Sequence, residues 1–452
     1  MRDDLPADVD VILSDEVLGR ELACTCGRDH RVPTRAVVIE NDAAGQVPEL
    51  LSRLAAGPRV LLVADHRTWE VAGIAVAAAL EGSHSVARCL LEDDADGQVH
   101  ASVELVDELE TTFDDEFDCY IAVGSGTVND LTKELAFRRR RPYVVFATAA
   151  SMNGYTSAIV ALLDNGLKTT RETAPPVAVF ADPEVLVGAP RELTLAGLGD
   201  LVSKPYCGCD WFIASLVKGE YHCPLPDRLL AGPFECALEV FPRLATDDPE
   251  VVELLFKLLL VSGISMAVTG TSSPASGGEH LLSHYWDMTR LRDGRPLNLH
   301  GAQVGVASLL VDELYSSILD LDFCAAGFRP SPPLAEAERR TGEIFGSVAG
   351  AVWPQWQAKL EARREADLKA LCAHQGEIKQ AIARTLEVGR GVRRALTGSG
   401  APTSAAQLGI DDRELVAAVR HGRKIRTRFT VFDVAAELGI LESFAGELGG
   451  GT

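Results

Sequence analysis

The first half of this 452-residue chain alternates short β-branched runs with helix-forming stretches, which leaves few possible folds. Amphipathic segments such as 68–81 and 127–141 separate the runs. Apolar strands that alternate with helices are typical of a parallel sheet covered by helices on both faces. We therefore expect six parallel strands, at 36–40, 59–65, 85–91, 118–124, 142–148 and 177–182.

The strand-like runs become rare after about residue 190, where stretches rich in Ala, Leu, Glu and Arg take over, as at 352–395. These stretches have helical periodicity and few helix breakers. The pattern predicts an α/β domain over residues 1–190 and an all-α domain over residues 191–452. The apolar stretch 251–270 contains Glu253 and Lys257, so we expect a buried helix and not a membrane span.

The composition limits the partners. A net charge of −22 argues against binding to nucleic acid or to an anionic membrane, since either would need a basic face. Ten cysteines are too few for a disulfide scaffold, and the start, MRDDLPADVD, has no basic segment followed by an apolar one. We expect a cytoplasmic protein with reduced cysteines that forms a homo-oligomer and acts on a small molecule.

The stretch DCYIAVGSGTVND, residues 118–130, reads as a strand, a glycine turn and a helix. Gly124 and Gly126 allow a tight turn, and the N–H groups at the start of the helix can hold a pyrophosphate. The spacing is not G-x-G-x-x-G, so an ordinary turn also fits. Asp65, at the end of an earlier strand, can accept hydrogen bonds from a ribose or cap a helix. Together these features favour a nucleotide site at one sheet edge.

A second set of residues suggests a metal. His280 and His284 are four apart, so on a helix they share a face. Asp200 and His300 are further oxygen and imidazole donors. The glutamate precedes the first histidine, which does not fit the H-E-x-x-H metalloprotease pattern. For any one of these histidines alone, an ordinary core or surface position is the favoured interpretation, and Asp200 alone could be a helix cap or a helix-terminal charge.

Cysteines raise a further possibility. Cys24, Cys26 and His30 have spacing that suggests zinc, but a fourth ligand is missing. Cys207, Cys209 and Cys223 follow Asp200 in the sequence, and packing as free thiols in a helical core is their expected role.

Four stretches together resemble one family. They are VGSGTVNDLTK, FATAASMNGYTSA, GLGDLVSK, and SSPASGGEHLLSHYWDM with LHGAQVGV. In this order they resemble sn-glycerol-1-phosphate dehydrogenases of the dehydroquinate synthase-like, metal-dependent alcohol dehydrogenase superfamily. Residues 24–40 and 426–441 resemble its bacterial branch. The resemblance implies a Rossmann-like domain followed by a helical domain. It also implies reduction of dihydroxyacetone phosphate to sn-glycerol 1-phosphate, a step of phospholipid metabolism.

The resemblance also implies roles for individual residues. Zinc, nickel or iron would be held by Asp200, His280 and His300, with His284 beside it as a substrate contact or proton relay. NAD(H) or NADP(H) would contact Asp65, Gly124, Ser125, Gly126, Asp130, Thr148 and Ser151. Substrate would contact Asn153, Ser157 and Lys204.

One departure from the family keeps alternatives open. The family usually has aspartate in S-M-D-G, whereas this chain has Asn153, which can hydrogen-bond a hydroxyl but cannot take a proton. Another polyol or sugar phosphate, or a cyclase reaction like that of dehydroquinate synthase, therefore remains possible. A catalytically inactive binding protein on the same fold is the alternative from another class. For the substrate phosphate, Lys204 and Lys168 are the candidate cations, and each could equally be a solvated lysine.

Overall fold

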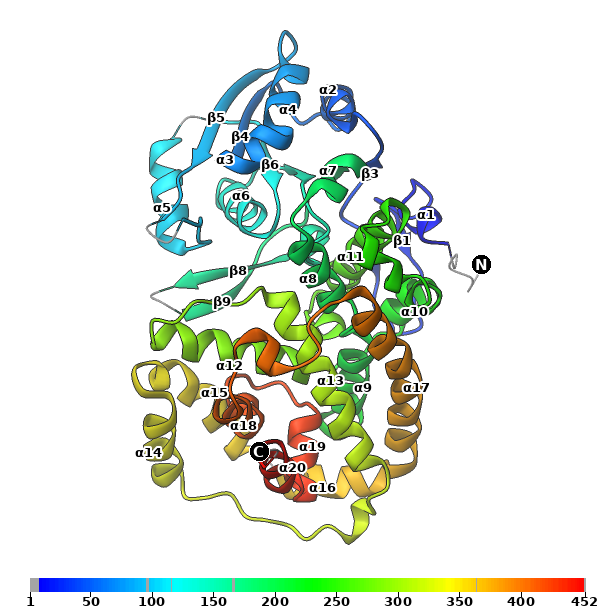
Figure 1. Ribbon diagram of the computed structural model, residues 1–452, viewed down its shortest axis with the longest axis vertical. Coiled ribbons are helices and arrows are strands. Elements are labelled where there is room, and N and C mark those ends of the chain that lie inside the picture. Colours follow the sequence, from blue (N-terminus) through cyan, green and yellow to red (C-terminus); the bar gives the residue numbers. More distant parts are fainter. Residues whose placement is uncertain (1–7, 95–96, 115, 165–166, 363, 451–452) are drawn as a thin grey trace. The chain divides into compact units, whose positions relative to one another are not determined.

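The computed structural model describes residues 8–94, 97–114, 116–164, 167–362 and 364–450 (Figure 1). The expectation that no leader is present rests partly on residues 1–7, which lie outside this description. The chain forms two compact units. Unit 1 comprises Met1–Leu201 and Cys223–Ser272, and unit 2 comprises Val202–His222 and Ser273–Thr452.

Unit 1 is built on a six-stranded parallel sheet with the order β3-β10-β7-β6-β4-β5. Each expected strand is present, and each observed end lies within one residue of the predicted end, so the prediction of a parallel α/β domain is confirmed. The strands are β3 (Ala36–Ile39), β4 (Arg59–Asp65), β5 (Ser85–Leu91), β6 (Cys119–Gly124), β7 (Tyr143–Ala147) and β10 (Ala178–Ala181).

The sheet is covered on both faces, as its continuous apolar strands require. Along β4, Val60 and Leu62 belong to one core cluster, to which α2 (Val47–Arg53) and α4 (Ile74–Leu80) also contribute. Leu61 points to the opposite face and has no exposed surface. The helix α6 (Gly126–Arg138) packs against β6, β4 and β7. Figure 1 shows α4 and α6 beside these strands.

Two short hairpins were not predicted. The strands β8 (Ile159–Asp164) and β9 (Leu167–Glu172) pair antiparallel, and so do β1 (Glu21–Leu22) and β2 (His30–Arg31). An Asn-Gly pair occupies positions 165–166 of the sequence, and this dipeptide is a strong hairpin signal that could have revealed the first of them. The two turn residues themselves lie outside the described ranges.

Unit 1 extends beyond the expected boundary at residue 190. The helix α11 (Pro249–Thr269) is predominantly apolar, packs with α8 (Arg191–Leu201) and α10 (Leu225–Leu238), and clusters with the sheet. By length and composition α11 could cross a membrane, but 78% of its most apolar window is buried, in agreement with the predicted buried helix. A helix that is apolar around most of its circumference needs neighbours on most sides, which explains why 223–272 belongs to unit 1. The other helices of unit 1 are α1 (Val9–Ile12), α3 (His66–Thr68), α5 (Val103–Thr112) and α7 (Pro183–Gly188).

All regular secondary structure among the described residues of unit 2 is helical, which confirms the expected all-α region. Two of its helices, α12 (Gly278–Arg292) and α13 (His300–Leu319), pack against each other. The remaining helices are α9 (Lys204–Lys218), α14 (Leu334–Phe345), α15 (Ala349–Glu361), α16 (Arg364–Ala373), α17 (Gln375–Ser399), α18 (Asp412–His421), α19 (Val431–Leu438) and α20 (Leu441–Leu448).

One cysteine pair departs from the expectation that all thiols are reduced. Cys324 and Cys372 of unit 2 form a disulfide, with Cα atoms 4.7 Å apart. That separation lies within the range a disulfide can bridge. Sequence spacing alone gave no sign of this pair, because 48 residues separate the two cysteines.

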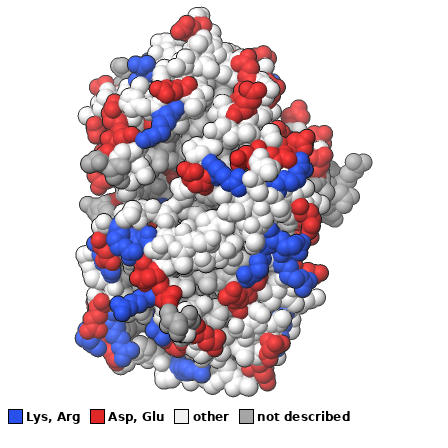
Figure 2. All heavy atoms as spheres, in the orientation of Figure 1, with Lys and Arg blue, Asp and Glu red and all other residues white. Residues whose placement is uncertain are grey.

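Charged side chains of both signs are interspersed on the face shown in Figure 2. Although the protein is acidic, its cations lie among carboxylates and form ion pairs with them, as Arg138 does with Glu134.

Candidate functional site

The glycine turn lies at a special position of the sheet. After β4 the chain adds β5 on one side, and it then returns to add β6 on the other side of β4. The order of strands therefore reverses between β4 and β6. In open α/β sheets, ligands bind outside the carboxyl ends of the strands at such a switch point. Asp65 ends β4 and Gly124 ends β6, so both predicted cofactor residues lie at this edge.

The turn itself is tightly packed. A Cβ on Gly124 would lie 2.6 Å from Cβ of Val128, so only glycine allows the first turn of α6 to lie this close to β6. Ser125 is the N-cap of α6, and its side chain makes no capping hydrogen bond. The N–H groups at the start of α6 are therefore not used by the Ser125 hydroxyl. Thr148, which follows β7, donates its N–H to the carbonyl oxygen of Gly124 at 3.3 Å.

We expect Gly124→Ala to raise KM for NAD(P)H about tenfold, because overpacking against Val128 costs about 1–3 kcal/mol and displaces the start of α6. Steady-state kinetics with varied cofactor measures this. Gly376→Ala is the matched control, since a Cβ there meets nothing within 4 Å. Equal KM values for both variants would contradict a cofactor role for the turn.

Other predicted cofactor residues also have structural partners. The Asp65 carboxylate accepts from the Thr68 N–H at 2.7 Å, so Asp65 caps α3. This helix capping is the second of the two roles that the sequence allows for Asp65. Asp130 accepts from the Ala161 N–H at 3.0 Å and from the side chain of Asn129, and burial raises the pKa of Asp130. Direct cofactor contacts of these residues stay predictions.

The loop after β7 is held by a lysine that sequence reasoning missed. The Lys133 side chain is buried in unit 1, and its Nζ donates to the carbonyl oxygens of Gly154 at 2.6 Å, Ser157 at 3.1 Å and Ile159 at 3.2 Å. Burial lowers the pKa of Lys133 to about 8, and the nearby Asp130 opposes this shift. Lys133 thereby fixes the course of the loop that carries Asn153.

Ser157 belongs to this loop framework and not to an open surface. It has no exposed area, and its hydroxyl donates to the carbonyl oxygens of Gly154 and Ile159 at 2.9 and 3.1 Å. Backbone carbonyls and Lys133 surround the Ser157 hydroxyl, and the predicted substrate contact of Ser157 stays a prediction. Its role here is to shape the loop.

The same loop orients Asp200. The Asp200 carboxylate, 2% exposed, accepts from the backbone N–H of Asn153 at 2.9 Å and from Nδ2 of Asn153 at 3.1 Å. Gly197, one turn earlier on α8, permits this approach because a Cβ there would overlap the carbonyl oxygen of Ala150. Within unit 1, Asn153 is therefore the partner that fixes Asp200.

Unit 2 brings three histidines together on α12 and at the start of α13. The ring centroids of His280 and His300 lie 5.1 Å apart, and the ring of His284 stacks on that of His300 at 5.5 Å. The sequence predicts that these histidines form one group with Asp200. The three histidines lie together in unit 2, whereas Asp200 belongs to unit 1.

Two of these rings are fixed by hydrogen bonds at Nδ1. His280 Nδ1 lies 2.9 Å from Oε1 of the buried Glu279, and His300 Nδ1 lies 2.9 Å from Oγ of Ser283. Since Ser283 donates its proton to Gln303 at 2.6 Å, His300 must be the donor in its bond with Ser283. The Glu279 carboxylate and the Ser283 hydroxyl oxygen both act as acceptors, so the proton of each ring lies on Nδ1. The lone pair of each ring is then on Nε2. Histidine metal ligands typically have such a partner.

The structure adds one acidic residue to this cluster. Potential ligand atoms of His284, Asp287 and His300 all lie within 4.8 Å of one another, and Asp287 is 1% exposed. His280, His284 and Asp287 are at positions i, i+4 and i+7 of one helix, so the sequence signal existed. His300 is common to this set and to the predicted one.

Lys204, a predicted substrate residue, is the first residue of α9 and is buried in unit 2. Its Nζ donates to Oγ of Ser203 at 3.1 Å and to the carbonyl oxygen of Ala275 at 3.3 Å. Ala275 lies just before α12, so Lys204 supports the segment that leads to the histidines.

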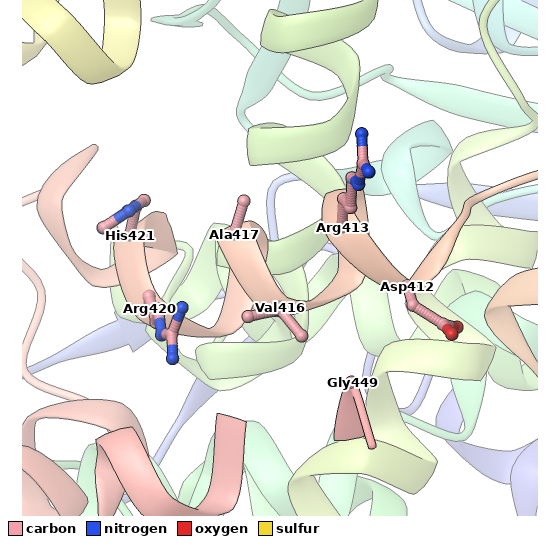
Figure 3. A pocket seen from close by; sticks show the side chains of 7 residues that line it. All are labelled: Asp412, Arg413, Val416, Ala417, Arg420, His421 and Gly449. Carbon is pink, nitrogen blue, oxygen red and sulfur yellow. The ribbon is translucent and has the colours of Figure 1, made fainter. Parts of the chain in front are cut away.

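A separate hollow of about 300 Å³ lies along α18 in unit 2 (Figure 3). Its lining includes Asp412, Arg413 and Arg420 of α18 together with Gly449, and none of the predicted site residues. We assign it no part in the chemistry.

Comparison with known proteins shows which family the chain belongs to. Residues 38–190 match the family model described as iron-containing alcohol dehydrogenase. The glycerol-1-phosphate dehydrogenase [NAD(P)+] of Geobacillus stearothermophilus is 30% identical over 431 residues, which cover 95% of this chain and 99% of that protein. The chain belongs to the glycerol-1-phosphate dehydrogenase family. The family's protein of the same name from Halalkalibacterium halodurans is 34% identical over 65% of this chain and 74% of its own length.

The fold of this family member is shared more widely. An iron-containing alcohol dehydrogenase from Thermococcus thioreducens superposes with a TM-score of 0.62 at 16% identity, covering 94% of this chain and 100% of that one. At this identity the match concerns the fold alone. It confirms the predicted combination of a parallel-sheet region and a helical region.

Proposed function

We propose that this protein is a metal-dependent oxidoreductase that reduces dihydroxyacetone phosphate to sn-glycerol 1-phosphate with NAD(P)H. The observation that carries the proposal is the pair His280 and His300, each with Nδ1 committed to an acceptor and Nε2 left as a donor atom for a metal. Family membership supplies the reaction class, since the relatives are named for it.

The residues fit a divalent metal. The proposed ligands are Asp200, His280 and His300, a carboxylate and two imidazoles of the kind that zinc, nickel and iron accept. Each has the second partner expected of a ligand: Asn153 for Asp200, Glu279 for His280 and Ser283 for His300. A bound metal supplies Lewis-acid chemistry to a carbonyl oxygen, and bound NAD(P)H supplies a hydride.

The protein's own side chains then orient the groups and move the proton. His284, one turn after His280 and stacked on His300, donates a proton from its ring to the substrate oxygen that gains negative charge. Asp287, one further turn along the same face, has a carboxylate oxygen within 4.8 Å of a ring nitrogen of His284 and is the proposed partner that orients this ring. Lys204 is the proposed cation for the substrate phosphate, and α6 with Gly124 and Gly126 holds the cofactor pyrophosphate.

Asn153 now has an explanation that does not need a different substrate. Its Nδ2 donates to the Asp200 carboxylate, which an ionised aspartate at this position could not do. The amide thus orients a proposed metal ligand. Since no contact among the described residues favours another polyol, we put forward no second function.

Removal of this amide should weaken metal binding. We expect Asn153→Ala to raise the Kd of the catalytic metal about 10–100-fold, as is usual when a partner of a metal ligand is lost. Titration of chelator-treated protein with metal, followed by restored activity, measures this. Gln357→Ala is the control for loss of an amide, because Gln357 on α15 of unit 2 donates to the exposed Glu361 of the same helix. Unchanged metal affinity in Asn153→Ala would contradict the orienting role.

The proposed function is tested by NAD(P)H oxidation with dihydroxyacetone phosphate, using chelator-treated protein reconstituted with zinc, nickel or iron. We expect metal-dependent, stoichiometric NAD(P)H consumption. A cyclase of the dehydroquinate synthase kind would consume none. Protein that binds metal and NAD(P)H but fails to turn over this substrate would overturn the proposal.

A further inference from the structure

A cluster of four sulfur and nitrogen ligands lies in unit 1, in a part of the chain that the proposed reaction does not use. Cys24 and Cys26 sit in the turn that joins β1 to β2, and His30 is the first residue of β2. From sequence, these three residues lacked a fourth ligand. The structure supplies one, because Cys223 at the start of the segment 223–272 reaches the same place.

The four ligand atoms surround one point. Sγ of Cys24 lies 3.5 Å from Sγ of Cys223, and Nε2 of His30 lies 3.0 Å from Sγ of Cys26 and 3.5 Å from Sγ of Cys223. All four atoms lie within 4.8 Å of one another. A tetrahedral zinc ion with Zn–S near 2.3 Å and Zn–N near 2.0 Å separates its ligand atoms by roughly 3.5–3.8 Å. The cluster therefore has the size of a zinc site without rearrangement of the chain.

The surroundings also suit a metal. Nδ1 of His30 lies 2.7 Å from the carbonyl oxygen of Val268, so the proton sits on Nδ1 and Nε2 points to the sulfurs as an acceptor. His30 is 2% exposed and Cys223 is 1% exposed. Backbone N–H groups approach two of the sulfurs, that of Cys26 toward Cys24 and that of Leu225 toward Cys223, at 3.5 and 3.4 Å. Such N–H groups stabilise thiolates, the form that binds metal.

We propose that Cys24, Cys26, His30 and Cys223 form a structural zinc site. Three sulfurs and one imidazole make a closed set with no position left for substrate, which is the arrangement of structural sites. The bound ion joins the β1–β2 hairpin to the start of α10 and, through His30 and Val268, to the end of α11. In Figure 1 these elements lie together at one side of unit 1.

The position of the site in the fold explains what a bound zinc ion would stabilise. The hairpin has only two paired residues in each strand, too few to be stable alone. Residues 223–272 reach unit 1 after the chain has passed through unit 2, so a link near Cys223 fixes their return. Cys24 and Cys223 are not joined by a disulfide, as metal binding requires.

The first test uses the full-length protein with His300→Ala, which removes the proposed catalytic metal and leaves the cysteine cluster intact. X-ray absorption at the zinc edge should show about three sulfur neighbours near 2.3 Å and one nitrogen near 2.0 Å, with roughly one zinc per chain. Cobalt substitution should give a thiolate-to-metal charge-transfer band. Absence of sulfur neighbours, or recovery of a Cys24–Cys223 disulfide from native protein, would overturn the proposal.

The second test compares cysteine variants in the same background. Cys24→Ser, which alters a half-buried thiol, and Cys223→Ser should each abolish the charge-transfer band and lower the melting temperature. Cys236→Ser is the matched control, because Cys236 is an exposed free cysteine on α10. A band that persists in Cys24→Ser and Cys223→Ser would refute the assignment. If a cysteine variant fails to fold, the X-ray absorption and charge-transfer measurements on His300→Ala, in which all cysteines are intact, still test the proposal.

Discussion

Replacement of His300 by alanine is expected to lower kcat/KM for reduction of dihydroxyacetone phosphate by about a thousandfold or more. His300 belongs both to the proposed ligand set and to the cluster with His284 and Asp287. Its loss therefore weakens metal binding whether Asp200 or Asp287 is the carboxylate ligand. Metal stabilisation of negative charge on a carbonyl oxygen is worth several kcal/mol, and about 4 kcal/mol corresponds to a thousandfold in rate. Steady-state kinetics and metal analysis of the purified variant measure both effects.

Two comparisons sharpen this test. His374→Ala removes an imidazole that pairs with Glu377 on the surface of unit 2, and it should leave kcat/KM within about twofold of wild type. Asp200→Asn should lose metal, whereas Asp287→Asn should keep the metal and lower kcat. If Asp287→Asn loses metal and Asp200→Asn retains it, the ligand set is His284, Asp287 and His300. Full activity in His300→Ala would contradict the account.

Lys133→Met is expected to destabilise the protein by about 3 kcal/mol and to lower metal-dependent activity. The ammonium group serves three backbone carbonyls of the loop around Asn153. The Ser157 hydroxyl can still donate to one of them, and each of the other two left without a donor costs about 1–3 kcal/mol. Methionine preserves most of the side-chain volume, so the effect reports the lost hydrogen bonds. Urea unfolding followed by fluorescence measures the change in free energy of unfolding.

Lys369→Met is the control for this experiment. Lys369 is an exposed lysine of α16 that pairs with Glu365 four residues earlier, and loss of such a pair costs about 0.3–0.5 kcal/mol. A stability change in Lys133→Met as small as in this control would show that the loop does not depend on the buried ammonium.

The sheet could be predicted from sequence because its strands are buried on both faces. Continuous apolar runs such as RVLLVAD, bounded by turn residues, fit a strand of a parallel sheet and little else. The extent of unit 1 could not be predicted in this way. The helix α11 is apolar around most of its circumference, so its sequence gives no sign of whether it packs with the sheet or with the other helices.

The candidate site was predictable where its residues are close in sequence. His280 and His284 lie on one helical face, and the glycine turn follows a strand directly. Lys133 gave no such signal, because its partners are backbone carbonyls 21 to 26 residues away. Cys223 is 193 residues from His30, so only the folded chain brings the fourth sulfur to the cluster.

The stereochemistry of the product tests the central claim most directly. The measurement is the enantiomer of glycerol phosphate formed from dihydroxyacetone phosphate by metal-reconstituted protein and NAD(P)H, determined by chiral separation. We predict sn-glycerol 1-phosphate alone, formed in a one-to-one ratio with NAD(P)H consumed. Formation of sn-glycerol 3-phosphate, or the absence of any glycerol phosphate from protein that has bound both metal and cofactor, would contradict the account.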